Sequence, residues 1–239
     1  MLSRIIDLYL PDTCALCQIL IDKRQPHLCC THCWSDLPWL DHQCRHCGLA
    51  LPDHDPRTRT LVCGRCLTQP LTIGIAVVPL AYNDDTQRLV HELKLQNNLR
   101  AAEILSVALA TRIQATYGMR PRPQYIVPTP LTWRRRVIRG YNQTVRLAFS
   151  LADKLSIPVH GTLSRRHGLP QHGRNRRARE AIPLNTFYMR RQLPADTFHI
   201  ALLDDVVTTG STMRVMAHTL QSAGVRRVDL WAPCRAALQ

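Results

Sequence analysis

The sequence lacks any run of about 18 consecutive apolar residues, so no segment is long enough to cross a bilayer as a helix. The first residues also lack the features of a secretory signal, because Asp7 interrupts the short apolar stretch and no small-residue cleavage site follows. These two absences disfavour a membrane-spanning or exported protein. We therefore expect a cytoplasmic protein.

Lysine is scarce in a strongly basic chain, since only Lys23, Lys94 and Lys154 occur among the 31 Lys and Arg residues. The excess of charge is concentrated, because residues 120–191 carry sixteen Lys or Arg and only two acids. The planar guanidinium of arginine suits bidentate contacts with phosphate. A solvated basic face is the alternative interpretation. The concentration of charge in one block favours contact with a polyanion such as nucleic acid.

Nine of the ten cysteines lie in the first 66 residues, and eight of them form four C-x-x-C pairs. The pairs are Cys14/Cys17, Cys30/Cys33, Cys44/Cys47 and Cys63/Cys66. A C-x-x-C turn places two thiolates on one side of a metal ion, and two such turns complete a tetrahedral zinc site. Four cysteine ligands leave no position open for substrate. The four pairs therefore predict two structural zinc ions.

Other interpretations of the cysteines are less favoured. A disulfide framework needs an oxidising compartment, and a thioredoxin-like redox pair would not occur four times in one chain. The sequential partition of the pairs is the simplest, but crossed pairing stays open from spacing alone. Cys29 is a candidate in place of Cys30, although only Cys30 keeps the spacing to Cys33. His32 and His46 are alternative ligands that complete cysteine sets make unnecessary.

The pattern changes near residue 70, where strands begin to alternate with helices. This boundary divides the chain into a double zinc ribbon, residues 1–70, and an α/β domain, residues 71–239. The alternation predicts a mostly parallel sheet with helices on both faces. The predicted strands are 73–80, 125–127, 199–203 and 228–232, and the predicted helices are 85–95, 98–117, 141–155 and 211–223.

The most specific chemical motif is a buried-type strand that ends in two acids and continues through a turn of small residues into a helix. Such a turn faces the crevice in which α/β proteins bind ligands, and the N–H groups at the helix start suit a phosphate dianion. Carboxylates suit neighbouring ribose hydroxyls or a bridging Mg ion. A plain helix cap would explain one Asp and one Thr, but not the whole set. The phosphate-binding candidates are Thr208, Thr209, Gly210, Ser211 and Thr212, and the acids are Asp204 and Asp205.

This motif resembles the phosphoribosyl-pyrophosphate (PRPP) signature of type I phosphoribosyltransferases. Together with the four cysteine pairs, it resembles the ComF/GntX family of competence and DNA-utilisation proteins. The resemblance covers nearly the whole chain and includes His91–Leu95, Val127–Leu131 and Arg139–Gln143. The chain departs from the family pattern at Ile182, where an asparagine is usual.

The resemblance implies a type I phosphoribosyltransferase-like domain behind the zinc ribbons. Asp204 and Asp205 would be the catalytic acids that hold the ribose of PRPP, with Mg as its companion ion. Residues 128–131 would correspond to the pyrophosphate loop. The arginines expected to contact pyrophosphate or a longer polyanion are Arg134, Arg135, Arg136, Arg139 and Arg179.

The implied function is the uptake, processing or utilisation of exogenous DNA, with PRPP or a nucleic-acid phosphate in the pocket. Single-stranded DNA and DNA-uptake proteins are the expected partners. The alternative is an active phosphoribosyltransferase that transfers ribose 5-phosphate from PRPP to a nucleobase or nucleotide. The complete acidic pair motivates it, but no segment of the sequence specifies a base. A purely structural zinc-ribbon adaptor leaves the phosphate motif unexplained.

Overall fold

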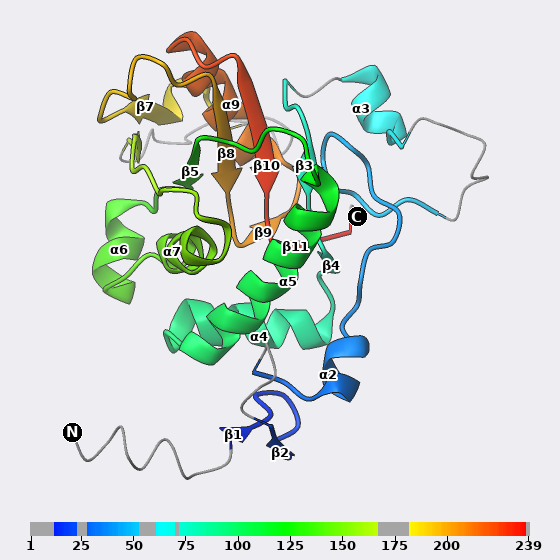
Figure 1. The fold of residues 1–239 in the computed structure, drawn as a ribbon. Coiled ribbons are helices and arrows are strands. Elements are labelled where there is room, and N and C mark those ends of the chain that lie inside the picture. The colour runs from blue at the N-terminus through cyan, green and yellow to red at the C-terminus, as the bar shows by residue number, and fades with distance from the viewer. Residues whose placement is uncertain (1–11, 23–27, 53–60, 70–71, 167–181, 238–239) are drawn as a thin grey trace, which may run out of the picture.

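The structure of the protein is a computed structural model that describes residues 12–22, 28–52, 61–69, 72–166 and 182–237; for Asp12 and residues 134–136 it describes the main chain only. Its centre is a four-stranded sheet in the order β3-β10-β8-β5, in which every neighbouring pair is parallel (Figure 1). The strands are β3 (Ala76–Val77), β5 (Tyr125–Pro128), β8 (His199–Leu203) and β10 (Arg227–Trp231).

A smaller parallel sheet lies beyond the carboxyl ends of these strands, in the order β4-β11-β9. It consists of β4 (Leu80–Ala81), β11 (Cys234–Arg235) and β9 (Val206–Val207). The single strand predicted over 73–80 is therefore wrong, because the structure has β3 and β4 on either side of Pro79. Proline has no N–H group for a sheet hydrogen bond, so the pairing changes partner there.

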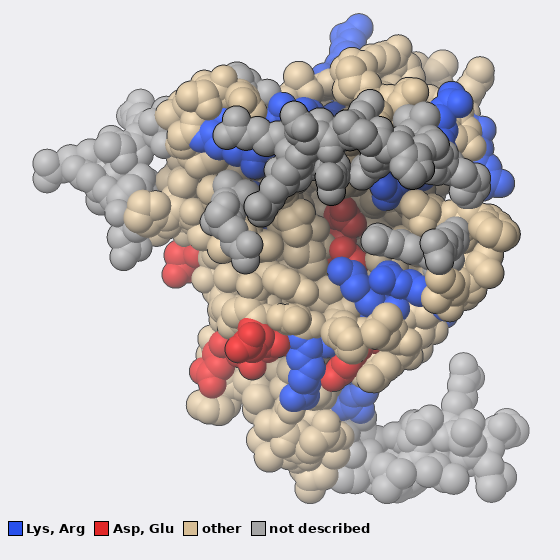
Figure 2. Space-filling view, turned by 180° about the vertical axis from the view of Figure 1, so that it is seen from behind, with Lys and Arg blue, Asp and Glu red and all other residues tan. Residues whose placement is uncertain are grey.

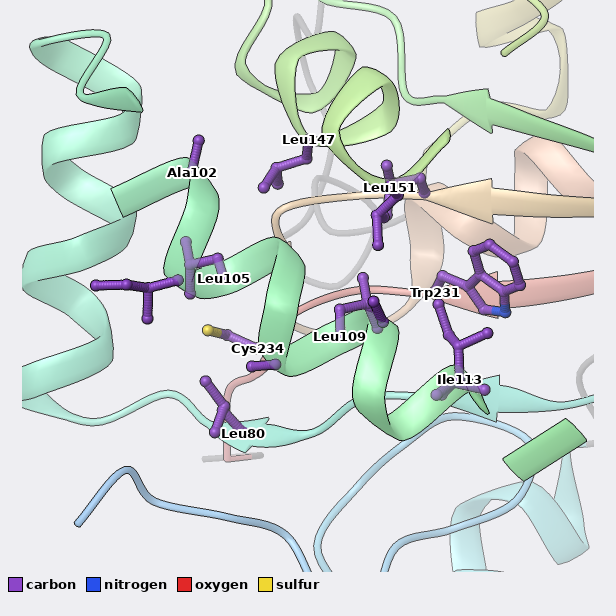
Figure 3. Packing of buried hydrophobic residues seen from close by; sticks show 14 of the residues in the cluster. Leu80, Ala102, Leu105, Leu109, Ile113, Leu147, Leu151, Trp231 and Cys234 are labelled. Atoms are coloured by element: carbon purple, nitrogen blue, oxygen red, sulfur yellow. The ribbon is translucent and has the colours of Figure 1, made fainter. Parts of the chain in front are cut away.

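Helices cover both faces of the central sheet (Figure 1). On one face, side chains of α5 pack with those of α7, Trp231 and the strand residues Ala201 and Leu203 (Figure 3). On the other face, α9 packs on Ile200 and Leu202, the alternate residues of the same strand. The helices are α4 (Asp84–Leu95), which packs on α5, then α5 (Leu99–Tyr117), α7 (Gln143–Leu155) and α9 (Ser211–Ser222). The predicted parallel architecture is confirmed.

Asparagine side chains begin the helices near the positions that the sequence predicts. Asn98 accepts from two backbone N–H groups of α5, and Asn142 accepts from the N–H of Thr144 in α7. Gly118 ends α5 with a φ of 52°, a conformation that glycine adopts easily. Periodicity did not predict the short helix α6 (Trp133–Arg139) or the antiparallel pair β6 (Leu163–Arg165) and β7 (Phe187–Met189).

The cysteine-rich module packs directly on the larger sheet. Its elements are β1 (Asp12–Thr13), β2 (Leu20–Ile21), α2 (Thr31–Ser35) and α3 (Gly64–Thr68). Buried cysteines from both halves of the module belong to the same hydrophobic clusters as the sheet residues. The main chain of Ala76 also donates to the carbonyl of Arg45 over 2.7 Å. Among the helices described, none has the length and apolar character needed to cross a membrane.

Candidate functional site

A cleft of about 270 Å³ opens where strands β5 and β8 end. Parallel strands bring the loops at their carboxyl ends to one edge of the sheet, which is where ligands bind in open α/β folds. The cleft brings together two acids, three cations, and hydroxyl and amide groups. Its lining residues are Lys94, Thr129, Pro130, Leu131, Thr132, Arg139, Gln143, Thr144, Arg165, Asp204, Asp205 and Thr212. Figure 2 shows acidic and basic side chains side by side near the middle of one face.

The two acids have different surroundings. Asp205 is 6% exposed, and its Oδ2 accepts from Gln143 Nε2 at 2.9 Å and lies 3.2 Å from Lys94 Nζ. Asp204 is half-buried and lines the cleft. Burial and the adjacent Asp205 carboxylate raise the pKa of Asp204 to about 8. A carboxyl that keeps its proton near neutral pH can donate a hydrogen bond as well as accept one, so Asp204 suits a sugar hydroxyl.

Residues 139–143 form the support of the cleft. The Tyr141 hydroxyl donates to the carbonyl of Leu93 at 2.7 Å, which ties the start of α7 to the end of α4. Asn142 donates to the carbonyl of Thr129 at 3.1 Å, while Gln143 joins Arg139 to Asp205. This motif therefore connects the loop after β5 with the acids after β8.

The turn from β9 into α9 has a glycine in the left-handed region at the start of the helix. Gly210 occupies the N-cap position with a φ of 76°, a region that other residues adopt only with strain. Neither Asp204 nor Asp205 caps α9, because their Oδ1 atoms accept from the next backbone N–H along the chain. Thr209 Oγ1 lies 2.9 Å from Ser211 Oγ. A plain acidic helix cap does not describe this turn.

The structure brings only some of the predicted site residues into the cleft. Asp204, Asp205, Thr212 and Arg139 line it. Thr209 instead lines a separate small crevice. The side chains of Arg134, Arg135 and Arg136 on α6, and the whole of Arg179, lie outside the described residues.

A second cleft of about 360 Å³ shares Pro130 and Leu131 with the first. Arg190 and Arg191 line it together with Tyr141. Arg165, which lines the first cleft, packs over the ring of Phe187 at 5.6 Å. The two clefts thus form adjoining hollows, each lined by arginine.

The eight predicted ligands form two clusters of four cysteines, and within each cluster the sulfur atoms lie within 4.8 Å of one another. Tetrahedral zinc with Zn–S bonds of about 2.3 Å places its sulfurs about 3.8 Å apart. The Sγ atoms of Cys17 and Cys30 are 3.7 Å apart, as are those of Cys47 and Cys63. The donor set and spacing fit structural zinc.

The clusters also settle the alternatives for the ligands. The first holds the first two C-x-x-C pairs and the second holds the last two, so the sequential partition is confirmed. Cys29 is buried but belongs to neither cluster. His46 Nδ1 lies 3.2 Å from the carbonyl of Ile73, and His32 lies 3.3 Å from Asp36. Within the described residues, each cluster consists of four cysteines.

Sequence reasoning missed four important residues. Lys94 and Gln143 hold Asp205, Thr129 donates to the carbonyl of Leu203 at 3.0 Å, and Arg235 donates to the carbonyls of Val207 and Thr208 before α9. Lys94, Gln143 and Thr129 lie within the segments that carry the family resemblance, so that signal could have found them. Arg235 lies in no recognised motif.

The fold and the site define an α/β protein with a cleft at the carboxyl ends of its parallel strands and two four-cysteine centres at its amino end. A family model described as "Double zinc ribbon domain" matches residues 5–67. The "DNA utilization protein YhgH" of Salmonella typhi is 33% identical over 233 residues, which is 95% of this chain and 99% of that protein. "Competence protein F" of Haemophilus influenzae is 30% identical over 81% of this chain and 84% of its own.

The chain therefore belongs to the family of these DNA utilization and competence proteins. Among solved structures, the purine phosphoribosyltransferase from Pyrococcus horikoshii matches with a TM-score of 0.32 and 20% identity, over 54% of this chain and 69% of that one.

Proposed function

We propose that the protein serves the utilisation of exogenous DNA in the cytoplasm by binding PRPP or a nucleic-acid phosphate in the cleft at the ends of β5 and β8. The observation that carries this proposal is the convergence of Asp204, Asp205 and Thr212 with Lys94 and Arg139 in one cleft. The names of its relatives, which refer to DNA utilization and competence, support the biological role. DNA-uptake proteins are the partners that this role implies.

The distribution of charge in the cleft suits a phosphorylated sugar. The amide N–H groups at the start of α9 and the hydroxyls of the turn offer donors to a 5'-phosphate. Asp204 lines the cleft beside them and suits the ribose hydroxyls. A Mg ion that accompanies PRPP would take oxygen ligands, which the Asp204 carboxyl and Thr212 can offer.

The arginine-lined hollows favour a polyanion longer than PRPP. Arg139 and Arg165 line the first cleft, and Arg190 and Arg191 line the second, which adjoins it. Successive phosphates of a single strand could contact both hollows, with the terminal phosphate at the start of α9. Electrostatic contacts of this kind release counterions and weaken with salt.

The domain boundary at residue 70 is part of the proposal. Residues 1–70 would supply the zinc ribbons and residues 71–239 the ligand cleft. The shared hydrophobic clusters support a module that stiffens the sheet rather than one that moves independently of it.

A calorimetric titration with Mg–PRPP tests the pocket. We expect the wild type to bind, and Asp204→Asn and Asp205→Asn to weaken binding by about tenfold or more, because each replaces a carboxyl group of the cleft by an amide, which cannot take its place toward Mg and the ribose hydroxyls. Asp153→Asn, whose side chain lines a groove between α5 and α7, is the matched control. Equal affinity in all four proteins would contradict the proposal.

Retardation of single-stranded DNA with a 5'-phosphate tests the polyanion. Binding should weaken steeply between about 50 and 200 mM salt. Arg139→Ala and Arg165→Ala should lower the salt dependence, whereas Arg146→Ala, in the groove between α5 and α7, should leave it unchanged. A flat salt profile would rule out this part of the proposal. Pyrophosphate release from PRPP in the presence of purines, pyrimidines and nicotinate would reveal the alternative transferase activity.

A further inference from the structure

Arg235 lies between the second cysteine cluster and the phosphate loop, which we define as residues 204–212. Its side chain is 3% exposed, and it is the second residue of β11, which pairs with β9 at the start of the loop. A guanidinium carries five N–H donors in a fixed plane, so it can hold groups on two sides at once. Arg235 is therefore placed to connect two parts of the molecule that lie far apart in sequence.

On one side, Arg235 Nε donates to the carbonyl of Cys47 at 3.0 Å. Cys47 belongs to the second cluster, so that cluster fixes the position of the Cys47 carbonyl. The neighbouring Gly48 N–H donates to the Cys44 carbonyl at 2.8 Å, which closes the knuckle around this position.

On the other side, Arg235 Nη1 donates to the carbonyls of Val207, at 3.0 Å, and of Thr208. Each peptide unit is planar and trans, so its C=O and N–H groups point in opposite directions. When the guanidinium holds these two carbonyls, the N–H groups of Thr208 and Thr209 point away from it. The conformation of the phosphate loop, and the direction of its donors, thus depends on Arg235.

The same region has a second sign of contact between the loop and the cluster. A small crevice is lined by Cys47 and Cys66 of the cluster, by Thr209 of the loop and by Arg235. The first cluster lies elsewhere, beside α4, where Arg88 donates to the carbonyl of Leu16.

We propose that Arg235 is a positioning residue of the phosphate loop and that it makes the loop's geometry depend on metal at the second cysteine cluster. The inference deepens the proposed function, because the ligand whose affinity it controls is the 5'-phosphate assigned to that loop. Metal at the second cluster fixes the Cys47 carbonyl, and Arg235 then holds the two loop carbonyls. Loss of the metal releases the arginine and with it the loop.

Hydrogen–deuterium exchange of the full zinc-loaded chain tests this without any ligand. Arg235→Lys keeps the charge but cannot hold carbonyls on both sides, so exchange of the loop amides should rise about tenfold or more. Arg112→Met is the matched control, since Arg112 donates to the carbonyl of Leu40 at 2.7 Å and joins the module to α5 instead. Unchanged loop exchange in Arg235→Lys would overturn the inference.

If Arg235→Lys fails to fold, a second pair of variants tests the link between the second cluster and the phosphate loop. Cys66→Ser weakens the second cluster and Cys33→Ser the first, with zinc content measured by mass spectrometry. Loop exchange should rise in Cys66→Ser only. Equal effects of the two substitutions would contradict the proposed link.

Ligand titrations separate this inference from the proposed function. Arg235→Lys should weaken the binding of ribose 5-phosphate by about tenfold but leave the binding of magnesium pyrophosphate unchanged. General destabilisation of the protein would weaken the binding of both ligands. A wild type that binds no ribose 5-phosphate would refute the proposed function, and loop exchange would still decide the role of Arg235. If the wild type and Arg235→Lys bind ribose 5-phosphate with equal affinity, the inference about Arg235 is refuted and the proposed function is not.

Discussion

The two cysteine clusters have nearly the same local structure but different surroundings. In each, the N–H of the first cysteine donates to the carbonyl five residues later, from Cys14 to Ile19 and from Cys44 to Leu49. The first cluster includes the exposed Cys17, whereas all four cysteines of the second are buried. The same four-cysteine unit thus occurs once with an exposed cysteine and once fully buried, beside the crevice that Thr209 and Arg235 line. Ligand spacing therefore determines the four-cysteine unit but not its surroundings.

The largest expected difference concerns stability. Cys47→Ser should lower Tm by about 10 °C or more, because all four cysteines of the second cluster are buried. Cys17→Ser should lower it much less, because Cys17 is exposed. Thermal unfolding with parallel zinc analysis measures both. Similar losses of Tm would remove the distinction between the clusters.

The next effect concerns the backbone at matched positions of the two knuckles. Gly48 has a φ of 70°, and a Cβ there would lie 2.5 Å from Val78 Cγ2. Gly48→Ala should therefore cost about 3 kcal/mol of unfolding free energy. Gln18, its counterpart with a φ of 65°, is exposed. Gln18→Gly should change stability by less than about 1 kcal/mol, since relief of strain offsets the greater freedom of glycine in the unfolded chain.

Denaturant unfolding of both variants provides the measurement. A cost of Gly48→Ala below that of Gln18→Gly would show that the second knuckle is not constrained by the sheet.

A smaller effect distinguishes the cleft from both clusters by the way in which folding stability depends on pH. The raised pKa of Asp204 means that, between its ordinary value near 4 and about 8, the folded protein holds a proton that the unfolded chain has lost. Stability therefore falls as pH rises through this window. Zinc loss has the opposite dependence, because acid protonates the thiolates. Asp204→Asn should raise Tm above pH 8 by a few degrees and flatten its decline.

Melting curves from pH 5 to 9, at constant zinc, check the dependence on Asp204. Asp153→Asn serves as the control outside the cleft. A wild-type Tm that does not decline between pH 5 and pH 8 would argue against a proton on Asp204.

The smallest effect should come from the link between the first cluster and α4. Arg88 donates to the carbonyl of Leu16 at 3.2 Å in an exposed position and also pairs with Glu92. Arg88→Met should cost about 0.5 kcal/mol, because exposed charged contacts contribute little. Urea unfolding measures it. A loss as large as that of Gly48→Ala would mean that the first cluster is as firmly integrated as the second.

Much of the fold could be predicted because its signals are local. Strand β8, the acidic pair and the start of α9 form a continuous segment, and asparagine caps place the starts of α5 and α7 within a few residues. The strand that Pro79 divides was predicted as one, because its apolar run continues through the break. The pair β6 and β7 was missed because its strands of three residues are too short for a periodic pattern.

The candidate site was predicted in part. The acids were identified from their position after β8, but their unequal environments were not. Asp205 is held by Lys94 from α4 and Gln143 from α7, two elements that come before it in the chain. No sequence spacing relates these residues, so only packing could reveal that Asp205 is paired while burial raises the pKa of Asp204.

The sequence by itself determined the two four-cysteine centres and the strand, acidic pair and small-residue turn of the loop at residues 204–212. Each depends on residues a few positions apart, whose geometry follows from local backbone conformation. The tertiary structure alone decided that the second centre, and not the first, lies against that loop through Arg235. Cys47, Val207 and Arg235 are distant in sequence, and they meet only because the module and the C-terminal strand β11 pack on the same end of the sheet.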